Sequence, residues 1–363
     1  MALDKGIHAE VPSGRVRRLV IIDQRGMREP VGQVLPLGGP CVLVRAPAKA
    51  NLFLAIRGRR PDGYHELVTV LQSVSLYDHL RVWIAGPVSQ GEHPAARMRM
   101  RVRLIHDAGP DVPTDQSNLA IRAARALGHV AKVLDLAIVD EQEARHAYQP
   151  GSVPVTMMDL EKRIPVGAGM AGGSADAAAA LIALNELWGC YLSRESLEAV
   201  GSTLGTDVPF CVTGGTALGT GRGATLAQVL CSGTFWWVVC QAHEPLFTAD
   251  VYRAWDRECA PSACEPDPVV TALRTCDARA LGAALHNDLE PAAFALRPEL
   301  ADAKAQLISA GALGAVLSGS GPTLLALCES EETARSLASS VAGRFRSVSV
   351  ARSPVGGPEV VPC

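Results

Sequence analysis

Apolar positions change their period several times along the chain, and each change predicts an element of a mixed α and β protein. The segment CVLVRAPAKANLFLAIRG, residues 41–58, predicts two strands joined by a short irregular piece at Ala46–Ala48. The turn-forming sequence Pro61–Gly63 follows it. A helix is predicted next, because four apolar residues recur at helical spacing: Leu67, Val70, Leu71 and Val74.

The middle of the chain predicts helices around a glycine-rich loop. NLAIRAARALGHVAKVL reads as a helix capped by Ser117 or Asn118, and residues 153–160 read as a strand. The sequence PVGAGMAGGSADAAAALIALNELWG then opens as a loop and continues as an alanine-rich helix that ends at Gly189. Ser193 is positioned to cap a further helix, and the glycine-rich stretch 214–223 predicts a tight hairpin.

The last third of the chain predicts an α/β plait. TFWWVVCQAHE reads as a buried strand, Thr248 or Asp250 begins a helix, and further helices are predicted near 268–285 and 298–310. GALGAVLSGSGPTLLALCES follows as a strand, a glycine turn and a second strand. A helix at 331–342 and a strand at 345–352 complete the order, which places the helices on one face of the sheet.

The length of 363 residues accommodates two domains with cores of their own. The expected organisation is an N-terminal extension, a domain that contains the glycine-rich loop, a C-terminal domain and a short tail. Their predicted bounds are 1–40, 41–223, 224–353 and 354–363. The apolar run Leu19–Ile22 is too short for the core of a signal peptide.

Composition narrows the class of protein. Hydrophobic residues make up 48% and charged residues 20% of the chain, which is typical of a soluble globular protein. The net charge of −3 gives no reason to expect binding to nucleic acid or to an anionic membrane. The ten cysteines include no C-x-x-C pair and no zinc pattern, so we expect reduced thiols and a cytoplasmic protein.

The glycine-rich loop is the strongest chemical signal. Free backbone N–H groups at the start of a helix bind anions, above all phosphate. Gly167, Gly169 and Gly172 match the dinucleotide pattern G-x-G-x-x-G, but Glu186, at the distance of the expected acidic residue, lies inside a helix. The spacing of Gly167 and Gly172 also fits a Walker A loop, but Gly173 stands where that loop needs a lysine. A tightly packed helix entry without a ligand is the remaining alternative.

Polar residues inside apolar segments give the other candidates. Lys49 and Asn51 share one strand face with Phe53 and could point into a pocket, although Lys49 could also reach solvent from a strand edge. Asp207 lies among apolar residues at a helix end, where it fits either a base paired with Lys49 or an ordinary turn. Tyr64, which is followed directly by a histidine, could hold a flat base beside the Pro61–Gly63 turn. It could equally belong to an ordinary turn at the surface.

Five segments in a fixed order resemble the GHMP kinase superfamily: PAKANLFL, DGYHEL, PVGAGMAGGSADAA, GTDVPF and LSGSGPT. The resemblance covers roughly residues 41–352, and the first, second and fourth segments favour the branch that acts on a cytidine diphosphate-linked methylerythritol. It implies a two-domain α+β fold, with an N-terminal domain like ribosomal protein S5 domain 2 and a ferredoxin-like α/β plait as the C-terminal domain. It also implies ATP-dependent phosphorylation of the 2-hydroxyl of that alcohol, in the non-mevalonate route to isoprenoids.

By the same resemblance, Asp207 accepts the proton of the substrate hydroxyl, and Lys49 keeps that carboxylate ionised and balances the growing charge. Asn51 would contact the erythritol part, Tyr64 and His65 the cytosine, with Phe247 as a second stacking ring. Ser174 would lie near Mg²⁺. The loop that wraps the ATP phosphates would consist of Pro165, Val166, Gly167, Ala168, Gly169, Met170, Ala171, Gly172, Gly173, Ser174 and Ala175.

The loop departs from the usual pattern at several positions. Ala168 and Ala171 stand where close relatives usually have glycine. Asp176 replaces an asparagine, which adds a negative charge near the expected phosphates unless its side chain faces the helix surface or helps to hold magnesium. The alternatives within the superfamily are homoserine and mevalonate kinases, whose substrates have no base for Tyr64 to stack on. A catalytically silent binding protein on the same fold is the alternative outside enzymes, and a monomer and a homodimer both fit the sequence.

Overall fold

The computed structural model describes residues 41–85, 97–104, 112–131, 137–138 and 155–363. The expected N-terminal extension, residues 1–40, lies outside these ranges. The chain from residue 40 onward forms one compact unit, and this unit is described below. Within the described residues, the helices are too short or too polar to cross a membrane.

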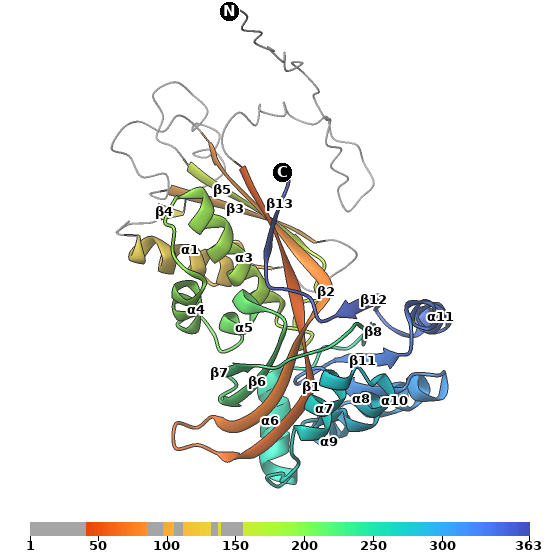
Figure 1. Ribbon diagram of the computed structural model, residues 1–363. Helices are drawn as coiled ribbons and strands as arrows, with labels where there is room; N and C mark the ends of the chain where they lie inside the picture. Colours follow the sequence, from red (N-terminus) through yellow and green to blue (C-terminus); the bar gives the residue numbers. More distant parts are fainter. Residues whose placement is uncertain (1–40, 86–96, 105–111, 132–136, 139–154) are drawn as a thin grey trace, which may run out of the picture. The chain divides into compact units, whose positions relative to one another are not determined.

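A long antiparallel pair of strands runs through the centre of this unit (Figure 1). Strand β1 (Cys41–Arg59) and strand β2 (His65–Ala85) are joined by the predicted turn, in which Gly63 has a φ of 84°. The sequence predicted two strands over 41–58, whereas β1 is one continuous strand. The predicted irregular piece is a register shift between Pro47 and Ala48. A bulge keeps the strand paired while changing its local twist.

The prediction of a helix over residues 67–74 is wrong, because this segment belongs to β2. Its apolar residues fit helical spacing, but Val68, Thr69 and Val70 are β-branched and favour a strand. The segment pairs with β1 on one side and with β6 on the other. Backbone pairing on both edges, together with burial, outweighs the local period.

The first sheet has the strand order β13-β1-β2-β5-β3-β4, and β6 and β7 form the predicted hairpin on β2. Helices α1, α3, α4 and α5 lie on one side of β1 and β2 (Figure 1). The predicted caps of α1 and α4, Asn118 and Ser193, are confirmed by bonds to Ala120 N and Ser196 N. The remaining strands are β3 (Arg97–Leu104), β4 (Ala137–Ile138), β5 (Val155–Lys162), β6 (Thr216–Gly221) and β7 (Thr225–Gln228). The helices are α1 (Leu119–Val130), α3 (Gly172–Leu187), α4 (Arg194–Ser202) and α5 (Val208–Thr213).

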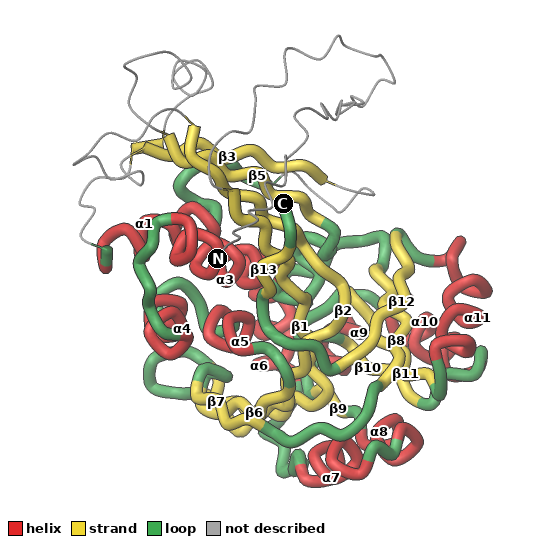
Figure 2. The backbone as a smooth tube through the Cα atoms, turned by 45° about the horizontal axis from the view of Figure 1, so that its top comes forward, coloured by secondary structure: helices red, strands yellow, loops and turns green. Residues whose placement is uncertain are grey.

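The second sheet confirms the predicted plait. Its order β10-β11-β8-β12 is antiparallel throughout, and helices are inserted after β8 and after β11 (Figure 2). This is the arrangement that the order of elements in the sequence predicted. The strands are β8 (Phe235–Gln241), β10 (Gly314–Leu317), β11 (Thr323–Cys328) and β12 (Ser347–Ser353). The helices are α6 (Thr248–Glu258), α7 (Asp267–Thr275), α8 (Ala278–Ala284), α9 (Glu290–Leu296), α10 (Pro298–Ser309) and α11 (Glu331–Val341).

Strand β1 contributes to the cores of both sheets. Its first half packs with α3 in the core of the first sheet, whereas Leu54 and Ile56 belong to the core of the plait. The short strand β9 (His286–Asn287) runs parallel to β1 at Phe53 and Leu54. Asn287 Nδ2 then donates to the carbonyls of Leu317 and Gly319, at 2.7 Å each. The two layers are therefore connected through β1 and β9.

Residues near the end of the chain pair with β1. Strand β13 (Glu359–Val361) pairs with β1, with Leu43 opposite Val361. The same register brings the ends of the two segments together, and Cys41 and Cys363 form a disulfide. The expectation of reduced thiols is wrong for this pair, because strand pairing across 322 positions cannot be read from cysteine spacing. The other cysteines of the described ranges are free.

Candidate active site

A single large cavity of about 1560 Å³ collects most of the predicted site residues. Its walls come from β1, β2, the glycine-rich loop before α3, the start of α5, helix α6 and the turn between β10 and β11. Segments far apart in the sequence therefore meet around one hollow.

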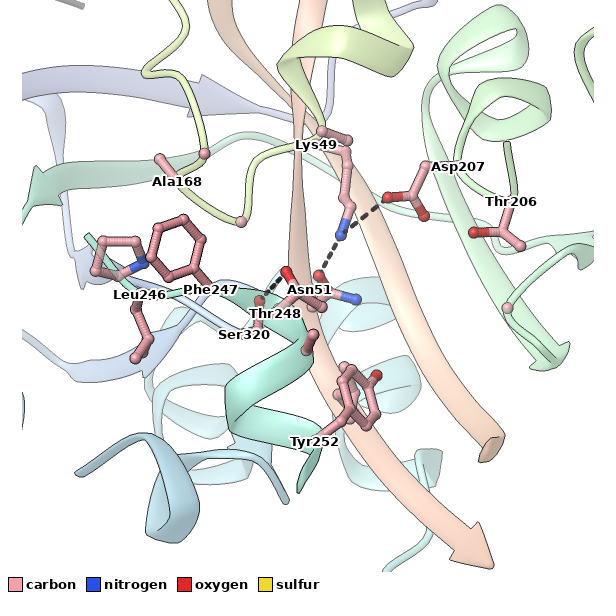
Figure 3. A pocket seen from close by; sticks show the side chains of 18 of the residues that line it. Lys49, Asn51, Ala168, Thr206, Asp207, Leu246, Phe247, Thr248, Tyr252 and Ser320 are labelled. Carbon is pink, nitrogen blue, oxygen red and sulfur yellow. Dashed lines mark hydrogen bonds and ion pairs between the residues drawn. The ribbon is translucent and has the colours of Figure 1, made fainter. Parts of the chain in front are cut away.

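Lys49 and Asp207 meet inside this cavity, as the sequence predicted. The Lys49 ammonium lies 3.7 Å from Asp207 Oδ2 and 2.5 Å from Asn51 Oδ1 (Figure 3). The lysine side chain is only 7% exposed, whereas that of Asp207 is 35% exposed. The carboxylate is thus accessible from the cavity, and the ammonium that faces it is held inside the protein.

Asn51 fixes the lysine. Its Oδ1 accepts from the Lys49 ammonium, and its Nδ2 donates to Thr69 Oγ1 at 2.9 Å. Thr69 in turn donates to the carbonyl of Phe53 at 2.7 Å. Asn51 lines the cavity, but both ends of its amide are already bonded within the protein.

The predicted common face of Lys49, Asn51 and Phe53 is interrupted by a register shift in β1. Asn51 pairs with Leu71 and Phe53 pairs with Val70, so the strand carries one extra residue between them. The bulge sends Phe53 into the core of the first sheet, and Leu54 lines the cavity in its place. Period-two reasoning fails at a bulge because the alternation of faces restarts there.

The glycine-rich loop packs against the turn between β10 and β11, residues 318–321. Ser318 Oγ donates to the carbonyl of Gly169 at 3.0 Å, and a Cβ atom at Gly169 would lie 2.0 Å from the carbonyl oxygen of Ser318. On its other side the loop bonds to β1, because Lys49 N donates to the carbonyl of Met170 at 3.2 Å. Close backbone approach explains the need for glycine at position 169.

Seven of the eleven residues predicted to wrap phosphate line the cavity: Val166, Gly167, Ala168, Gly169, Ala171, Gly172 and Gly173. Pro165, Met170 and Ala175 are buried behind them, and Ser174 is half-buried on the first turn of α3. Ala171, one of the departures from glycine, has a left-handed backbone with φ of 54°. This residue therefore carries strain that glycine would not have.

A buried ionic cluster lies directly behind the loop, and sequence reasoning missed it. The Lys162 ammonium bonds to Asp78 and, at 2.7 Å, to Asp176. Asp78 Oδ1 also accepts from the backbone N–H groups of Arg163 and Ile164. The side chains of the three ionic residues are at most 4% exposed. The cluster therefore ties β2 to the residues that lead into the loop and to the first turns of α3.

The charge of Asp176, which the sequence left unexplained, is thus directed away from the cavity and toward Lys162. Burial and the nearby Asp78 raise the pKa of Asp176 well above its usual range, in spite of the ammonium. Burial alone would lower the pKa of Lys162, but the two carboxylates outweigh it and raise that pKa. We infer a permanent ammonium shared by two carboxylates that compete for ionisation.

Aromatic residues gather at the end of the cavity beside the β1–β2 turn. The rings of His65 and Tyr252 stack with centroids 4.8 Å apart. Tyr64 is 54% exposed, and the guanidinium of Arg222 lies 3.7 Å from its ring centre. Tyr252 and Arg222 were not predicted as site residues. Burial raises the pKa of Tyr252 to about 12, so its hydroxyl stays neutral.

The structure does not bring Phe247 to this aromatic end. Phe247 is the N-cap residue of α6 and is 67% exposed, and its ring lies away from Tyr252 (Figure 3). It lines the same cavity, on the side of the glycine-rich loop. The ring that stacks on His65 is that of Tyr252, which lies more than one helical turn after Phe247, within α6.

Comparison with known families agrees with this architecture. Residues 118–215 match the family described as GHMP kinases N terminal domain, and residues 269–347 match GHMP kinases C terminal. Together the two matches indicate the class of GHMP kinases.

Curated relatives narrow the class to one family. A 4-diphosphocytidyl-2-C-methyl-D-erythritol kinase of Nocardia farcinica is 42% identical over 326 residues, which is 88% of this chain and 96% of the relative. Kinases of the same name from Mycolicibacterium smegmatis and Mycobacterium tuberculosis are 42% and 41% identical, over 88% of this chain and 92% and 93% of theirs. The chain therefore belongs to the GHMP kinases and, within them, to the 4-diphosphocytidyl-2-C-methyl-D-erythritol kinase family. It is an ATP-dependent kinase of small molecules.

Solved structures support the same placement. A crystal structure of 4-(cytidine 5'-diphospho)-2C-methyl-D-erythritol kinase aligns with a TM-score of 0.66 at 32% identity, covering 86% of this chain and all of that one. Homoserine kinase from Cytophaga hutchinsonii aligns with a TM-score of 0.63 at 20% identity, over 92% of this chain and 100% of that one, which shows a common fold. The predicted two-domain α+β fold is confirmed.

The left-handed backbone at Ala171 gives a stability prediction. We expect Ala171→Gly to raise the free energy of unfolding by about 0.5–1 kcal/mol, because the relief of left-handed strain exceeds the extra entropy of glycine in the unfolded chain. Urea unfolding followed by circular dichroism measures this change. Gly169→Ala is the matched opposite, because its Cβ would collide with a backbone carbonyl, and it should destabilise the protein. A stability loss in Ala171→Gly would contradict the strain assigned to this residue.

Proposed function

We propose that this kinase transfers the γ-phosphate of ATP to the 2-hydroxyl of 4-diphosphocytidyl-2-C-methyl-D-erythritol, a step of the non-mevalonate route to isoprenoid precursors. The observation that carries the proposal is the Lys49–Asp207 pair, 3.7 Å apart, in the cavity that the glycine-rich loop also lines. The bounds of the catalytic domain, 41–223, and of the second domain, 224–353, belong to the same proposal. Because both substrates are charged, water-soluble nucleotides, we place the enzyme in the cytoplasm.

Asp207 acts as the general base. Its carboxylate takes the proton of the substrate hydroxyl while that oxygen forms a bond to the γ-phosphorus, and the bond to the bridging oxygen of ADP breaks. Lys49 faces the carboxylate from a buried position and offsets the negative charge that collects around the transferred group. Asn51 keeps the ammonium in this place. A base positioned in this way contributes about 10²–10⁴ in rate.

The glycine-rich loop holds the triphosphate with backbone N–H groups at the start of α3, which supports phosphate binding without a Walker lysine. Magnesium in such enzymes is bound by one or two protein oxygens together with phosphate oxygens and water. We assign this small share of the coordination to the Ser174 hydroxyl, because Ser174 is half-buried on the first turn of α3 and follows Gly173, which lines the cavity. When bound, the ion neutralises charge on the phosphates.

The aromatic end of the cavity supports a substrate with a nucleobase. Tyr64 offers an exposed ring and Tyr252 a ring that His65 already holds in place. We assign the stacking role to Tyr252 instead of Phe247, because Tyr252 is the ring beside His65. Homoserine and mevalonate have no flat ring to occupy this end, so they fit the cavity less well.

A comparison of acceptors tests the substrate. We expect ATP-dependent release of ADP with the cytidine-linked methylerythritol, and release at the background rate with homoserine or mevalonate, because only the first occupies both ends of the cavity. A coupled assay for ADP measures all three, with a reaction lacking acceptor as control. Turnover with homoserine or mevalonate alone would assign the chain a different substrate. No turnover with any acceptor, despite binding, would favour a silent binding protein.

Removal of the base gives the second kinetic prediction. Asp207→Asn keeps the shape of the side chain but cannot accept a proton, so kcat should fall by about 10²–10⁴. The Kd for ATP should stay within about threefold, because the loop that binds phosphate is unchanged. Glu244→Gln, which changes another carboxylate of the cavity wall, serves as the control and should retain activity. Near-normal kcat in Asp207→Asn would remove the base assignment.

Variants of Tyr252 and Phe247 test which of the two rings stacks on the cytosine. Tyr252→Ala should raise the KM for the cytidine-linked substrate by about tenfold or more, since base stacking is worth roughly 1–3 kcal/mol, and leave the KM for ATP nearly unchanged. Phe247→Ala should change the KM for the cytidine-linked substrate much less. Steady-state kinetics of both variants decides the point. The reverse ranking would restore Phe247 as the stacking ring.

A further inference from the structure

The ring of His65 is enclosed by one face of helix α6. Tyr252 stacks on it at 4.8 Å, Trp255 meets it edge-on at 5.5 Å with an interplanar angle of 87°, and Asp256 Oδ1 lies 2.7 Å from its Nε2. The three residues of α6 are spaced by three and four positions, so they project from the same side of the helix. The histidine side chain is only 9% exposed.

The bond between His65 and Asp256 has a fixed polarity. An ionised carboxylate only accepts hydrogen bonds, so Nε2 must carry the hydrogen. In the neutral ring this selects one of the two tautomers, and the imidazole cannot rotate without breaking the bond. Asp256 is itself 29% exposed and lines the cavity. It acts on the Tyr252 ring indirectly, because it bonds to His65 and His65 stacks on that ring.

This contact joins the two layers of the protein at the cavity. His65 is the first residue of β2 in the first sheet, whereas α6 follows β8 in the plait. Tyr252 is therefore held from two sides, by its own helix and by a ring that belongs to the other layer. A shift of α6 relative to β2 would move Tyr252, and Asp256 is the polar contact that opposes such a shift.

We propose that Asp256 is a positioning residue for the nucleotide end of the cavity, which fixes His65 against Tyr252 and so sets the surface on which cytosine stacks. The inference rests on the proposed substrate, because it concerns the part of the cavity assigned to the base. If Asp256 has this role, recognition of the base depends on a contact between the two layers of the protein.

Calorimetric titration of the full chain with cytidine diphosphate and with a non-hydrolysable ATP analogue tests the inference. Asp256→Ala should raise the Kd for cytidine diphosphate by about tenfold, since a hydrogen bond to a charged group is lost, and leave the Kd for the ATP analogue unchanged. Asp256→Asn should restore the affinity to within about threefold, because its amide oxygen still accepts from Nε2. Asp250→Ala, on the same helix and paired with Arg253 at the surface, should bind both ligands like the wild type.

The outcomes separate this inference from the proposed function. Unchanged affinity of Asp256→Ala for cytidine diphosphate overturns the positioning role while the kinase assignment stands. An equal loss of both ligands also overturns it, because the residue would then act on the fold as a whole. If the wild type neither binds cytidine diphosphate nor phosphorylates the cytidine-linked alcohol, the proposed function fails together with the inference.

A measurement on the unmodified protein keeps the proposal testable if Asp256→Ala does not fold. Nitrogen-15 NMR of the histidine rings, at a pH where His65 is neutral, reports which ring nitrogen carries the hydrogen. The proposal predicts the tautomer protonated at Nε2 for His65. The tautomer protonated at Nδ1 would contradict the bond to Asp256 and overturn the proposal.

Discussion

The site depends on a buried ammonium held between two carboxylates. Lys162 lies behind the glycine-rich loop, bonded to Asp78 of β2 and Asp176 of α3. Burying charges is costly, and removal of one partner from such a group typically destabilises a protein by about 3–5 kcal/mol. The cluster therefore fixes the direction in which the chain leaves β5 and enters α3. That direction sets the position of the glycine-rich loop, which lines the cavity.

The glycine-rich loop in turn contacts the other elements that form the site. The carbonyl of Met170 bonds to the backbone of Lys49, and the carbonyl of Gly169 bonds to Ser318 of the plait. Strand β1 thus holds the Lys49 ammonium at a set distance from the loop. The Asp176 carboxyl points to Lys162, whereas the Lys49 ammonium faces Asp207. Under the proposed function, Lys49 is therefore left for Asp207 and the transferred phosphate.

Sequence reasoning found the elements with strong local signals and failed where distant pairing decides. The plait, the glycine-rich loop, the hairpin near 214–223 and the Lys49–Asp207 pair followed from period, turn residues and resemblance. Residues 67–74 form a strand because two neighbours pair with them, and the partner of Cys41 lies at the far end of the chain. Lys162 and Tyr252 looked like ordinary positions of their elements, since no local pattern shows what a side chain will meet.

A structure with a non-hydrolysable ATP analogue and the cytidine-linked methylerythritol bound tests the central claim most directly. The account predicts the triphosphate along the glycine-rich loop, the acceptor hydroxyl within hydrogen-bond reach of Asp207, and cytosine against Tyr252. A triphosphate bound elsewhere, or an acceptor hydroxyl far from that carboxylate, would contradict it.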